Sequence, residues 1–160
     1  MRHVLSIIVE NKPGVLARVS ALFARRGYNI DSLAVGETED PTVSRITLVV
    51  SGDETILEQI TKQLNKLIDV VKIIDLTSSS FVDRELLLLR INVTPTTRPE
   101  IMQIVDIFRA RIVDVSDRTI IIEATGDEGK VKAIGDLLRR FGIKEMVRTG
   151  KVALSRGDKK

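Results

Sequence analysis

Residues 4–35 read VLSIIVENKPGVLARVSALFARRGYNIDSLAV, and this stretch changes its apolar spacing twice. Val4 to Val9 is an aliphatic, β-branched run of strand length that stops at Asn11 and Pro13. A helix ending at Gly27 is then predicted, because apolar residues recur on one helical face. This stripe consists of Val15, Leu16, Val19, Leu22 and Phe23. A second strand is predicted over 29–35, so the stretch encodes a strand, a helix and a strand.

The rest of the first half completes one small fold. A polar turn over 36–42 leads into a strand over 44–50, whose alternation places Ile46, Leu48 and Val50 on one face. Gly52 and Asp53 open a second helix, and 70–76 closes the half as a strand. The order βαββαβ predicts a four-stranded antiparallel sheet with both helices on one face, the ferredoxin-like arrangement.

The second half repeats this order after the serine-rich stretch Thr77 to Ser80. Strands are predicted over 85–93, 111–115, 119–124 and 143–148, and helices over 100–110 and 127–141. The tripeptide Gly-Asp-Glu at 52–54 recurs at 126–128, which indicates an internal repeat. We therefore predict an α+β chain of two ferredoxin-like βαββαβ domains, at 1–77 and 84–160, with a linker at 78–83.

Each predicted sheet has a second face that no helix covers. In the first half the strands carry apolar residues on both alternations, with Leu5 and Ile7 on one face and Val4 and Ile8 on the other. An apolar face of this kind favours burial against another surface. We expect oligomerisation, most simply a two-fold dimer.

The composition argues against several classes of protein. The chain has no cysteine and only one histidine, His3, so disulfides and thiolate metal sites are excluded and we expect no metal. Its apolar runs are far shorter than the roughly 20 residues that cross a bilayer. No signal-peptide pattern is recognised near the N-terminus. We expect a cytoplasmic protein without a membrane span.

A nucleic-acid-binding module on the same ferredoxin-like order is the alternative from another class. It is favoured by the pI of 9.3, although the net charge is only +3. Single-stranded nucleic acids are usually held by stacking on aromatic rings, and this chain has one Tyr, four Phe and no Trp. A free-standing enzyme is a weaker alternative, because no convincing acid-base or nucleophile set is present.

The first strand-to-helix turn, NKPG at 11–14, is the candidate site. Pro at the first helical position and a capping Asn are ordinary helix-start chemistry. We place Gly14 inside the first turn, where Gly costs about 1 kcal/mol against Ala, and infer that something approaches the backbone there. First-turn amides suit a carboxylate, and the Asn11 and Asn29 oxygens suit an ammonium group, so an α-amino acid would fit. Its apolar side chain would contact Val15, Leu16, Ile30 and Val35.

These residues carry a resemblance to a known family. NKPGVLARVSALFARRGYNI at 11–30 resembles the ACT domain, a βαββαβ module that binds amino acids and regulates enzymes of amino-acid metabolism. NIDSLAVGETEDPTVSRIT at 29–47 and RTGKVALSRG at 148–157 are similar to the regulatory, or small, subunits of acetolactate synthase, also called acetohydroxyacid synthase. ELLLLRINV, IFRARIVDVS and FGIKEMVRTG are similar to the C-terminal domain of that family.

The resemblance implies a non-catalytic partner of a large subunit that condenses pyruvate with pyruvate or 2-ketobutyrate. Thiamine diphosphate, magnesium and FAD are expected only on that large subunit, and no cofactor is expected here. The family's small subunit raises the activity of the large one. It also confers feedback inhibition, usually by valine, on the biosynthesis of valine, isoleucine and leucine.

The resemblance further implies that valine lies between the ACT domains of a homodimer. The loop contacts carried over are Asn11, Gly14, Val15 and Leu16, and those of the opposing chain are Asn29 and Ile30. Gly36 and Gln59 match positions at which the family's response to valine is also sensitive. The equivalent turn of the second half, TPTTRPE at 94–100, lacks the Asn-x-Pro-Gly pattern. We therefore expect no amino-acid seat there, and a role for that half in large-subunit contact or assembly.

Overall fold

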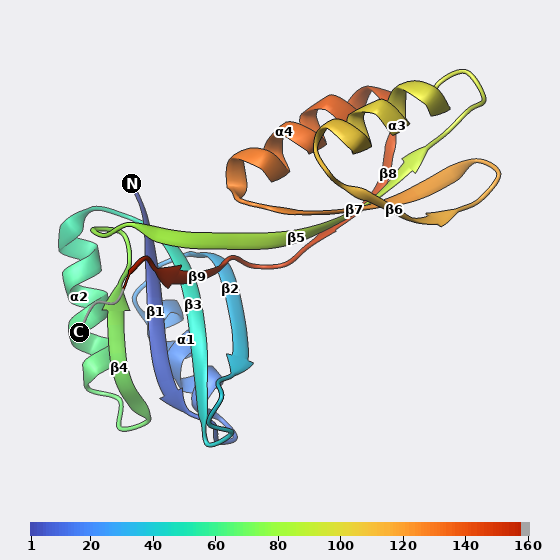
Figure 1. Ribbon diagram of the computed structural model, residues 1–160. Coiled ribbons are helices and arrows are strands. Elements are labelled where there is room, and N and C mark those ends of the chain that lie inside the picture. Colours follow the sequence, from blue (N-terminus) through green and yellow to red (C-terminus); the bar gives the residue numbers. More distant parts are fainter. Residues whose placement is uncertain (158–160) are drawn as a thin grey trace. The chain divides into compact units, whose positions relative to one another are not determined.

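The computed structural model describes residues 1–157 and divides the chain into two compact units (Figure 1). Unit 1 comprises Met1–Val82 together with the segment that begins at Gly150, and unit 2 comprises Asp83–Thr149. The sequence placed the C-terminal domain at 84–160 and a linker at 78–83. In the structure the chain is already in a strand at Phe81, and the segment from Gly150 onward groups with unit 1.

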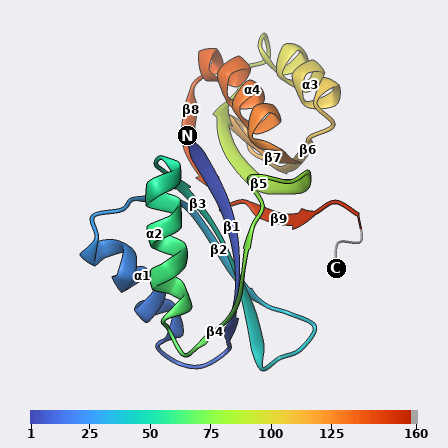
Figure 2. The same cartoon turned by 90° about the vertical axis from the view of Figure 1, so that its left-hand side faces the viewer.

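Unit 1 has the predicted βαββαβ order. Its elements are β1 (Arg2–Glu10), α1 (Val15–Arg25), β2 (Ile30–Glu37), β3 (Val43–Ser51), α2 (Glu54–Asn65) and β4 (Val70–Asp75). The antiparallel sheet has the strand order β2-β3-β1-β4, so β2 and β4 are its edges. Both helices cover the same face of this sheet (Figure 2). The ferredoxin-like prediction for this half is confirmed.

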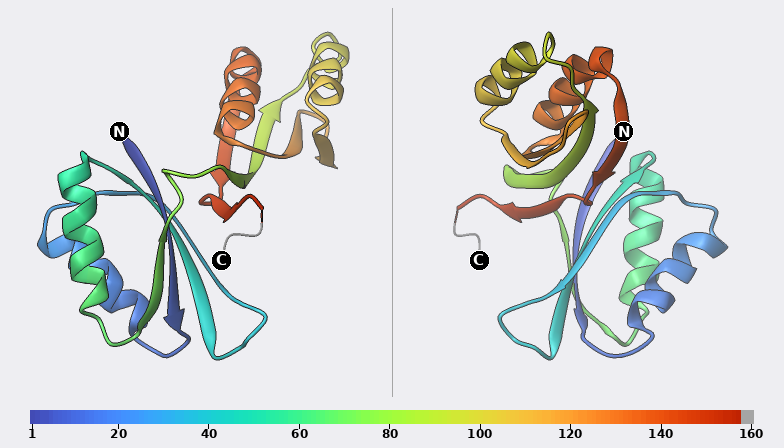
Figure 3. Two further views of the ribbon diagram at one scale, coloured as in Figure 1. Left: turned by 60° about the vertical axis from the view of Figure 1, so that its left-hand side comes forward. Right: turned by 90° about the vertical axis from the view of Figure 1, so that its right-hand side faces the viewer.

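Unit 2 repeats the arrangement, with the strand order β6-β7-β5-β8. Its elements are β5 (Phe81–Asn92, whose first two residues belong to unit 1), α3 (Arg98–Ile107), β6 (Arg111–Val115), β7 (Thr119–Gly126), α4 (Glu128–Leu138), a 3-10 turn (Arg139–Phe141) and β8 (Ile143–Arg148). Helices α3 and α4 lie together over one face of this second sheet (Figure 3).

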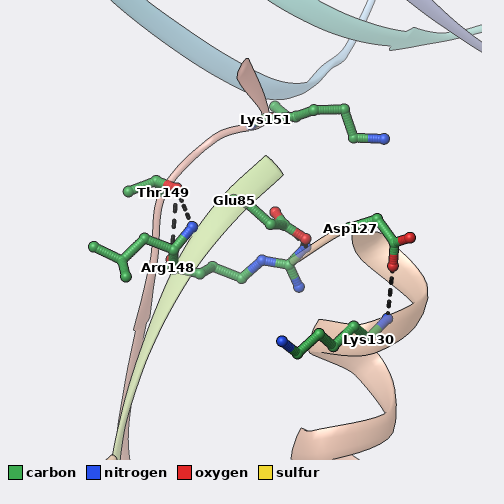
Figure 4. Close-up of polar contacts among 8 residues, drawn as sticks. Glu85, Asp127, Lys130, Arg148, Thr149 and Lys151 are labelled. Carbon is green, nitrogen blue, oxygen red and sulfur yellow. Dashed lines mark hydrogen bonds and ion pairs between the residues drawn. The ribbon is translucent and has the colours of Figure 1, made fainter. Parts of the chain in front are cut away.

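The internal repeat extends to the helix caps. Asp53 Oδ1 accepts a hydrogen bond from the Ile56 amide at 2.9 Å, and Asp127 Oδ1 accepts one from the Lys130 amide at the same distance (Figure 4). A carboxylate at this position satisfies a free amide and lies at the positive end of the helix dipole. The recurring Gly-Asp-Glu therefore starts the second helix of each unit in the same way.

Each unit has its own core between sheet and helices. In unit 1, Leu5 and Ile7 of β1 pack against Phe23 of α1 and Ile60 of α2, and all four side chains are buried. In unit 2, Leu89 of β5 and Ile101 of α3 are buried in the equivalent core. The alternation of the strands thus directs one set of side chains toward the helices in each half.

The second face of the first sheet is partly covered by the chain itself, which the sequence analysis did not foresee. A short strand, β9 (Val152–Ser155), belongs to the segment after Gly150, and its Ala153 packs with Val4, Val49 and Leu76. The Arg156 amide donates to the Ser80 carbonyl at 2.8 Å. These four apolar residues are buried without a second chain, so this face alone is a weaker argument for oligomerisation than expected.

Candidate functional site

The β1–α1 loop starts the helix differently from the prediction. Helix α1 begins at Val15, and Gly14 is its N-cap residue, with φ of 85° in the left-handed region. Pro13 therefore precedes the cap and does not occupy the first helical position, and no side chain caps the helix. The placement of Gly14 inside the first turn is wrong. Its backbone conformation, which L side chains rarely adopt, explains the glycine without a ligand.

The Val15 amide donates weakly to the Lys12 carbonyl at 3.4 Å, but no side chain caps the next amides of the first turn of α1, those of Leu16 and Ala17. Positive charge lies beside them, because a Cβ at Gly14 would be only 3.0 Å from Nη1 of Arg18. Arg18 is held by Asp69, whose Oδ2 is 2.8 Å from the Arg18 Nε. Open amides, a helix dipole and a guanidinium together suit a carboxylate. Arg18 was not among the predicted site residues, although its position one helical turn after Gly14 could have indicated it.

Asn11 does not cap the helix either. Its side-chain Nδ2 donates to the Pro41 carbonyl at 2.9 Å and to Glu37 Oε1 at 3.3 Å. Its backbone amide donates to the Thr42 carbonyl at 2.8 Å. Asn11 is thus fixed to the β2–β3 turn, and its amide nitrogen faces two acceptors.

Asn29 lies in a small polar network at the start of β2. Its Nδ2 donates to Asp31 Oδ1 at 2.9 Å. The hydroxyl of Ser51 donates to the other carboxylate oxygen, and Arg2 Nε lies 3.6 Å from that same oxygen. The hydrogen bond from Ser51 is the main cause that lowers the pKa of Asp31, with Asn29 and Arg2 acting in the same direction. Asp31 is therefore a carboxylate at neutral pH.

A single chain does not bring Asn11 and Asn29 together. Ile30, next to Asn29, pairs with Val50, whereas Asn11 contacts Glu37 at the other end of β2. Strand β2 has eight residues, which span about 25 Å at about 3.3 Å per residue. The two asparagines therefore lie near opposite ends of one edge strand.

The remaining predicted site residues lie on three elements, α1, β2 and α2. Val15 is 3% exposed and packs in the core, so only its backbone faces the loop, whereas Leu16 is 41% exposed. Ile30 is half-buried against the core, and Gly36 is exposed on β2 with no atom near a Cβ position. Gln59 lies on α2, where its Oε1 accepts a hydrogen bond from the Tyr28 hydroxyl at 2.5 Å.

The corresponding turn of unit 2 is closed by its own side chains. The Thr97 hydroxyl accepts from the Thr94 amide at 3.0 Å, and the Thr94 hydroxyl accepts from the Thr97 amide at 3.1 Å. This turn has no equivalent of Asn11 or of the left-handed Gly14.

Residues 1–157 show no second candidate site for catalysis, metal binding or stacking of bases. His3 is buried, with its Nε2 3.0 Å from the Gly52 carbonyl oxygen, which suits a structural role. No group of metal-ligating side chains is found within residues 1–157, and no aromatic side chain there is among the exposed large apolar ones. None of the helices in this range has the length and apolar character to cross a membrane.

A hollow of about 380 Å³ lies between α1 and α2 and is lined by Leu22, Arg25, Arg26 and Gln63. None of the predicted site residues lines it.

Comparison with known proteins identifies the kind of module that this fold and loop form. Residues 5–72 match the family model described as the AHAS small subunit-like ACT domain, and residues 84–157 match that of the small subunit of acetolactate synthase. Unit 1 is therefore an ACT domain. The chain belongs to the family of acetolactate synthase small subunits, which are regulatory and non-catalytic subunits of branched-chain amino acid biosynthesis.

The similarity extends over the whole chain. A probable acetolactate synthase small subunit from Archaeoglobus fulgidus is 58% identical over 160 residues, which cover 100% of both chains. The acetolactate synthase small subunit of Mycobacterium leprae is 52% identical over 97% of this chain and 92% of its own. The crystal structure of the small subunit from Thermotoga maritima has a TM-score of 0.90 and 44% identity, and the match covers 99% of each chain.

Proposed function

We propose that this chain binds the catalytic subunit of acetolactate synthase, raises its activity and makes it sensitive to feedback inhibition by valine. The observation that carries the effector part of this proposal is the placement of Asn11 and Asn29 near opposite ends of edge strand β2. In a two-fold dimer, Asn11 of one chain and Asn29 of the other can together form one complete site.

The dimer we propose joins the β2 edges of two ACT domains. β2 is an edge strand of the first sheet, and Leu33 and Val35 on it are 37% and 47% exposed. An unpaired edge with exposed apolar residues favours pairing with another strand. In an antiparallel pair of β2 strands, the start of one strand lies beside the end of the other. Asn29 of one chain then approaches the Asn11 loop of its partner.

The polar groups that the two chains of the dimer would contribute to the site fit an α-amino acid. The Leu16 and Ala17 amides, which no side chain caps, and the Arg18 guanidinium receive the carboxylate. The side-chain oxygens of Asn11 and Asn29 receive the ammonium group, because their nitrogens are engaged elsewhere. The exposed side chains of Leu16 on α1 and Val35 on β2 contact the apolar side chain in this scheme, which favours a small aliphatic amino acid such as valine.

Regulation follows from the position of the effector between two chains. A ligand that contacts both chains stabilises the dimer that binds it, and by linkage the dimer binds it more tightly than separated chains do. Inhibition then requires that the valine-bound dimer couple less favourably to the active state of the catalytic subunit. Thiamine diphosphate, magnesium and FAD belong to the catalytic subunit in this scheme.

Substitution of Gly14 tests the site directly. Gly14→Asp places a carboxylate beside Arg18 and the first-turn amides, so it competes with the valine carboxylate. Gly14→Asn is the matched control, because Asn has the same shape and tolerates the left-handed region equally well. Calorimetry should show valine binding by the unaltered chain, weaker binding by Gly14→Asn and none by Gly14→Asp.

Two results would contradict the proposal. Equal valine binding by the Asp and Asn variants would place the carboxylate elsewhere. Failure of the unaltered chain to co-purify with a catalytic subunit, together with steeply salt-dependent RNA binding, would favour a nucleic-acid-binding module instead.

A further inference from the structure

We propose that Asp31 is a positioning residue that turns the side-chain oxygen of Asn29 toward the effector, so that the site selects an amino acid over the 2-oxo acid of the same carbon skeleton. The inference rests on the proposed valine site and adds the means by which that site recognises the ammonium group. No sequence pattern singled out Asp31 for this role.

The orientation of the Asn29 amide follows from the chemistry of its partner. An ionised carboxylate only accepts hydrogen bonds, whereas an amide side chain has a donor end and an acceptor end. The Asn29 Nδ2 is 2.9 Å from Asp31 Oδ1, so the donor end faces the carboxylate. The acceptor end, Oδ1, must then point away from Asp31.

Asp31 is itself held in place on both sides. The Ser51 hydroxyl donates to Oδ2, the oxygen that Asn29 does not use, and Arg2 Nε lies 3.6 Å from it. The Asp31 side chain is only 19% exposed. The lowered pKa of Asp31, caused first by the Ser51 hydrogen bond, keeps the carboxylate ionised at neutral pH. Rotation of the Asn29 amide by 180° would therefore place an oxygen against a fixed negative charge.

Asn11 has the same polarity at the other end of β2. Its Nδ2 faces the Pro41 carbonyl at 2.9 Å and the Glu37 carboxylate at 3.3 Å, and both partners are acceptors. The two asparagines of the proposed site thus both have their donor ends occupied. Asn11 has two acceptors for its two side-chain N–H donors, and Asn29 has one of its two donors engaged by Asp31, so the side-chain oxygen of each amide is the group we expect to accept from a ligand.

Two fixed acceptors discriminate strongly between ligands that differ at the α-carbon. An ammonium group has three donors and pairs with both oxygens. The keto oxygen of a 2-oxo acid accepts only, so it would face two further acceptors and leave all of them unpaired. Unpaired polar groups in a binding site cost enough to reject such an analogue. The proposed regulator would then respond to the amino-acid end product and ignore 2-oxo acids, the class to which pyruvate and 2-ketobutyrate belong.

The test measures binding of two probes, valine and 3-methyl-2-oxobutanoate, to the full-length chain by calorimetry. Asp31→Ala removes the acceptor and lets the Asn29 amide rotate. Asp31→Asn removes the charge but keeps an oxygen that can accept from Asn29. Asp75→Ala is the control, because Asp75 also accepts from an amide, that of Thr77 at 3.0 Å, but lies on β4 at the other edge of the sheet.

The unaltered chain and the Asp75→Ala variant should bind valine and not the 2-oxo acid. Asp31→Ala should bind valine about tenfold more weakly, which corresponds to about 1.4 kcal/mol of binding free energy. The ratio of its affinities for valine and for the 2-oxo acid should also be smaller than in the unaltered chain. The valine affinity of Asp31→Asn should be closer to that of the unaltered chain than the affinity of Asp31→Ala is. A comparison of urea midpoints separates loss of binding from loss of folding in each variant.

Three outcomes would overturn the inference. Unchanged preference in Asp31→Ala would show that Asn29 does not depend on Asp31. If Asp31→Asn and Asp31→Ala bind valine equally weakly, the Asp31 charge attracts the ammonium group directly and does not act by positioning Asn29. If the unaltered chain binds no valine, the proposed function is itself contradicted. The first two outcomes contradict only the role of Asp31.

Discussion

Gly150 lies against the backbone of Leu33, so closely that a Cβ at residue 150 would be 2.4 Å from the Leu33 carbonyl oxygen. The next residue strengthens this contact, because the Lys151 amide donates to the Ser32 hydroxyl at 2.9 Å. The segment after Gly150 is thereby attached to β2, the strand on which we place half of the effector site.

We predict that Gly150→Ala destabilises unit 1 by about 1–3 kcal/mol, because either β2 or the segment must move to admit the methyl group. The change should appear as a lower urea midpoint of unfolding. Gly129→Ala in α4 is the control, since a Cβ there meets only Asp127 Oδ1 at 3.5 Å. Alanine favours a helix by up to about 1 kcal/mol over glycine, so the control should be neutral or stabilising. Equal effects of the two substitutions would contradict the close contact at Gly150.

The two aspartate caps give a second prediction. Asp53→Ala and Asp127→Ala should each cost about 1 kcal/mol of stability, because each leaves a first-turn amide without its acceptor. Asp→Asn at the same positions keeps a side-chain oxygen and should cost much less. Thermal unfolding of the four variants would measure this. If Asn costs as much as Ala at both positions, the side-chain oxygen is not the source of the stabilisation.

The ion pair between Glu85 and Arg148 gives a third prediction (Figure 4). The Glu85 side chain is 4% exposed, and Arg148 Nη2 lies 3.1 and 3.2 Å from its two oxygens. Arg148→Ala should cost about 1–3 kcal/mol, because it leaves a buried carboxylate without its partner. The double variant Glu85→Gln/Arg148→Ala should recover part of this loss, since no charge is then left buried. A double variant less stable than Arg148→Ala alone would contradict this reading of the pair.

Asp31 gives a prediction on pH. Its pKa is lower in the folded chain than in the unfolded chain, so the unfolded chain binds the proton more readily. The resulting stabilisation is complete above the unfolded pKa and is lost as the pH falls through the folded pKa. Neutral pH lies well above this window, so valine affinity should not vary with Asp31 ionisation there.

The measurement is an NMR titration of the Asp31 carboxyl carbon. Ser51→Ala should raise the pKa of Asp31, because the Ser51 hydrogen bond is the largest cause that lowers it. Asp75→Ala should leave it unchanged. An Asp31 pKa that does not respond to Ser51→Ala would show that the hydroxyl does not stabilise the carboxylate.

Most of the fold could be predicted from the sequence, because its strands and helices have the regular spacing of buried faces. The strand predicted over 143–148 coincides with β8, and Val19 and Phe23 of the predicted helical stripe are buried, whereas Leu16 of that stripe is exposed. The return of the chain after Gly150 could not be predicted in this way. Strand β9 has four residues, and its Ala153 packs with Val4, a contact remote in sequence.

The candidate site was predicted less completely. Asn11 and Asn29 were proposed from the sequence because their side-chain oxygens can accept hydrogen bonds from an ammonium group, and this role stays a prediction. Gly14 was placed inside the first helical turn, whereas it is the N-cap, since a spacing pattern does not reveal a backbone in the left-handed region. The roles we propose for Arg18 and Asp31 could not be predicted from the sequence, because they depend on contacts with Asp69 and Ser51 that form only in the fold.

The central claim is that this chain makes a catalytic subunit respond to valine. The most direct measurement is the rate of acetolactate formation by a purified catalytic subunit, with and without this chain, as the valine concentration is raised. We predict a higher rate when the chain is added, a fall in that rate with valine, and no fall when the chain carries Gly14→Asp. A rate that the chain leaves unchanged, or a fall with valine that Gly14→Asp does not abolish, would contradict it.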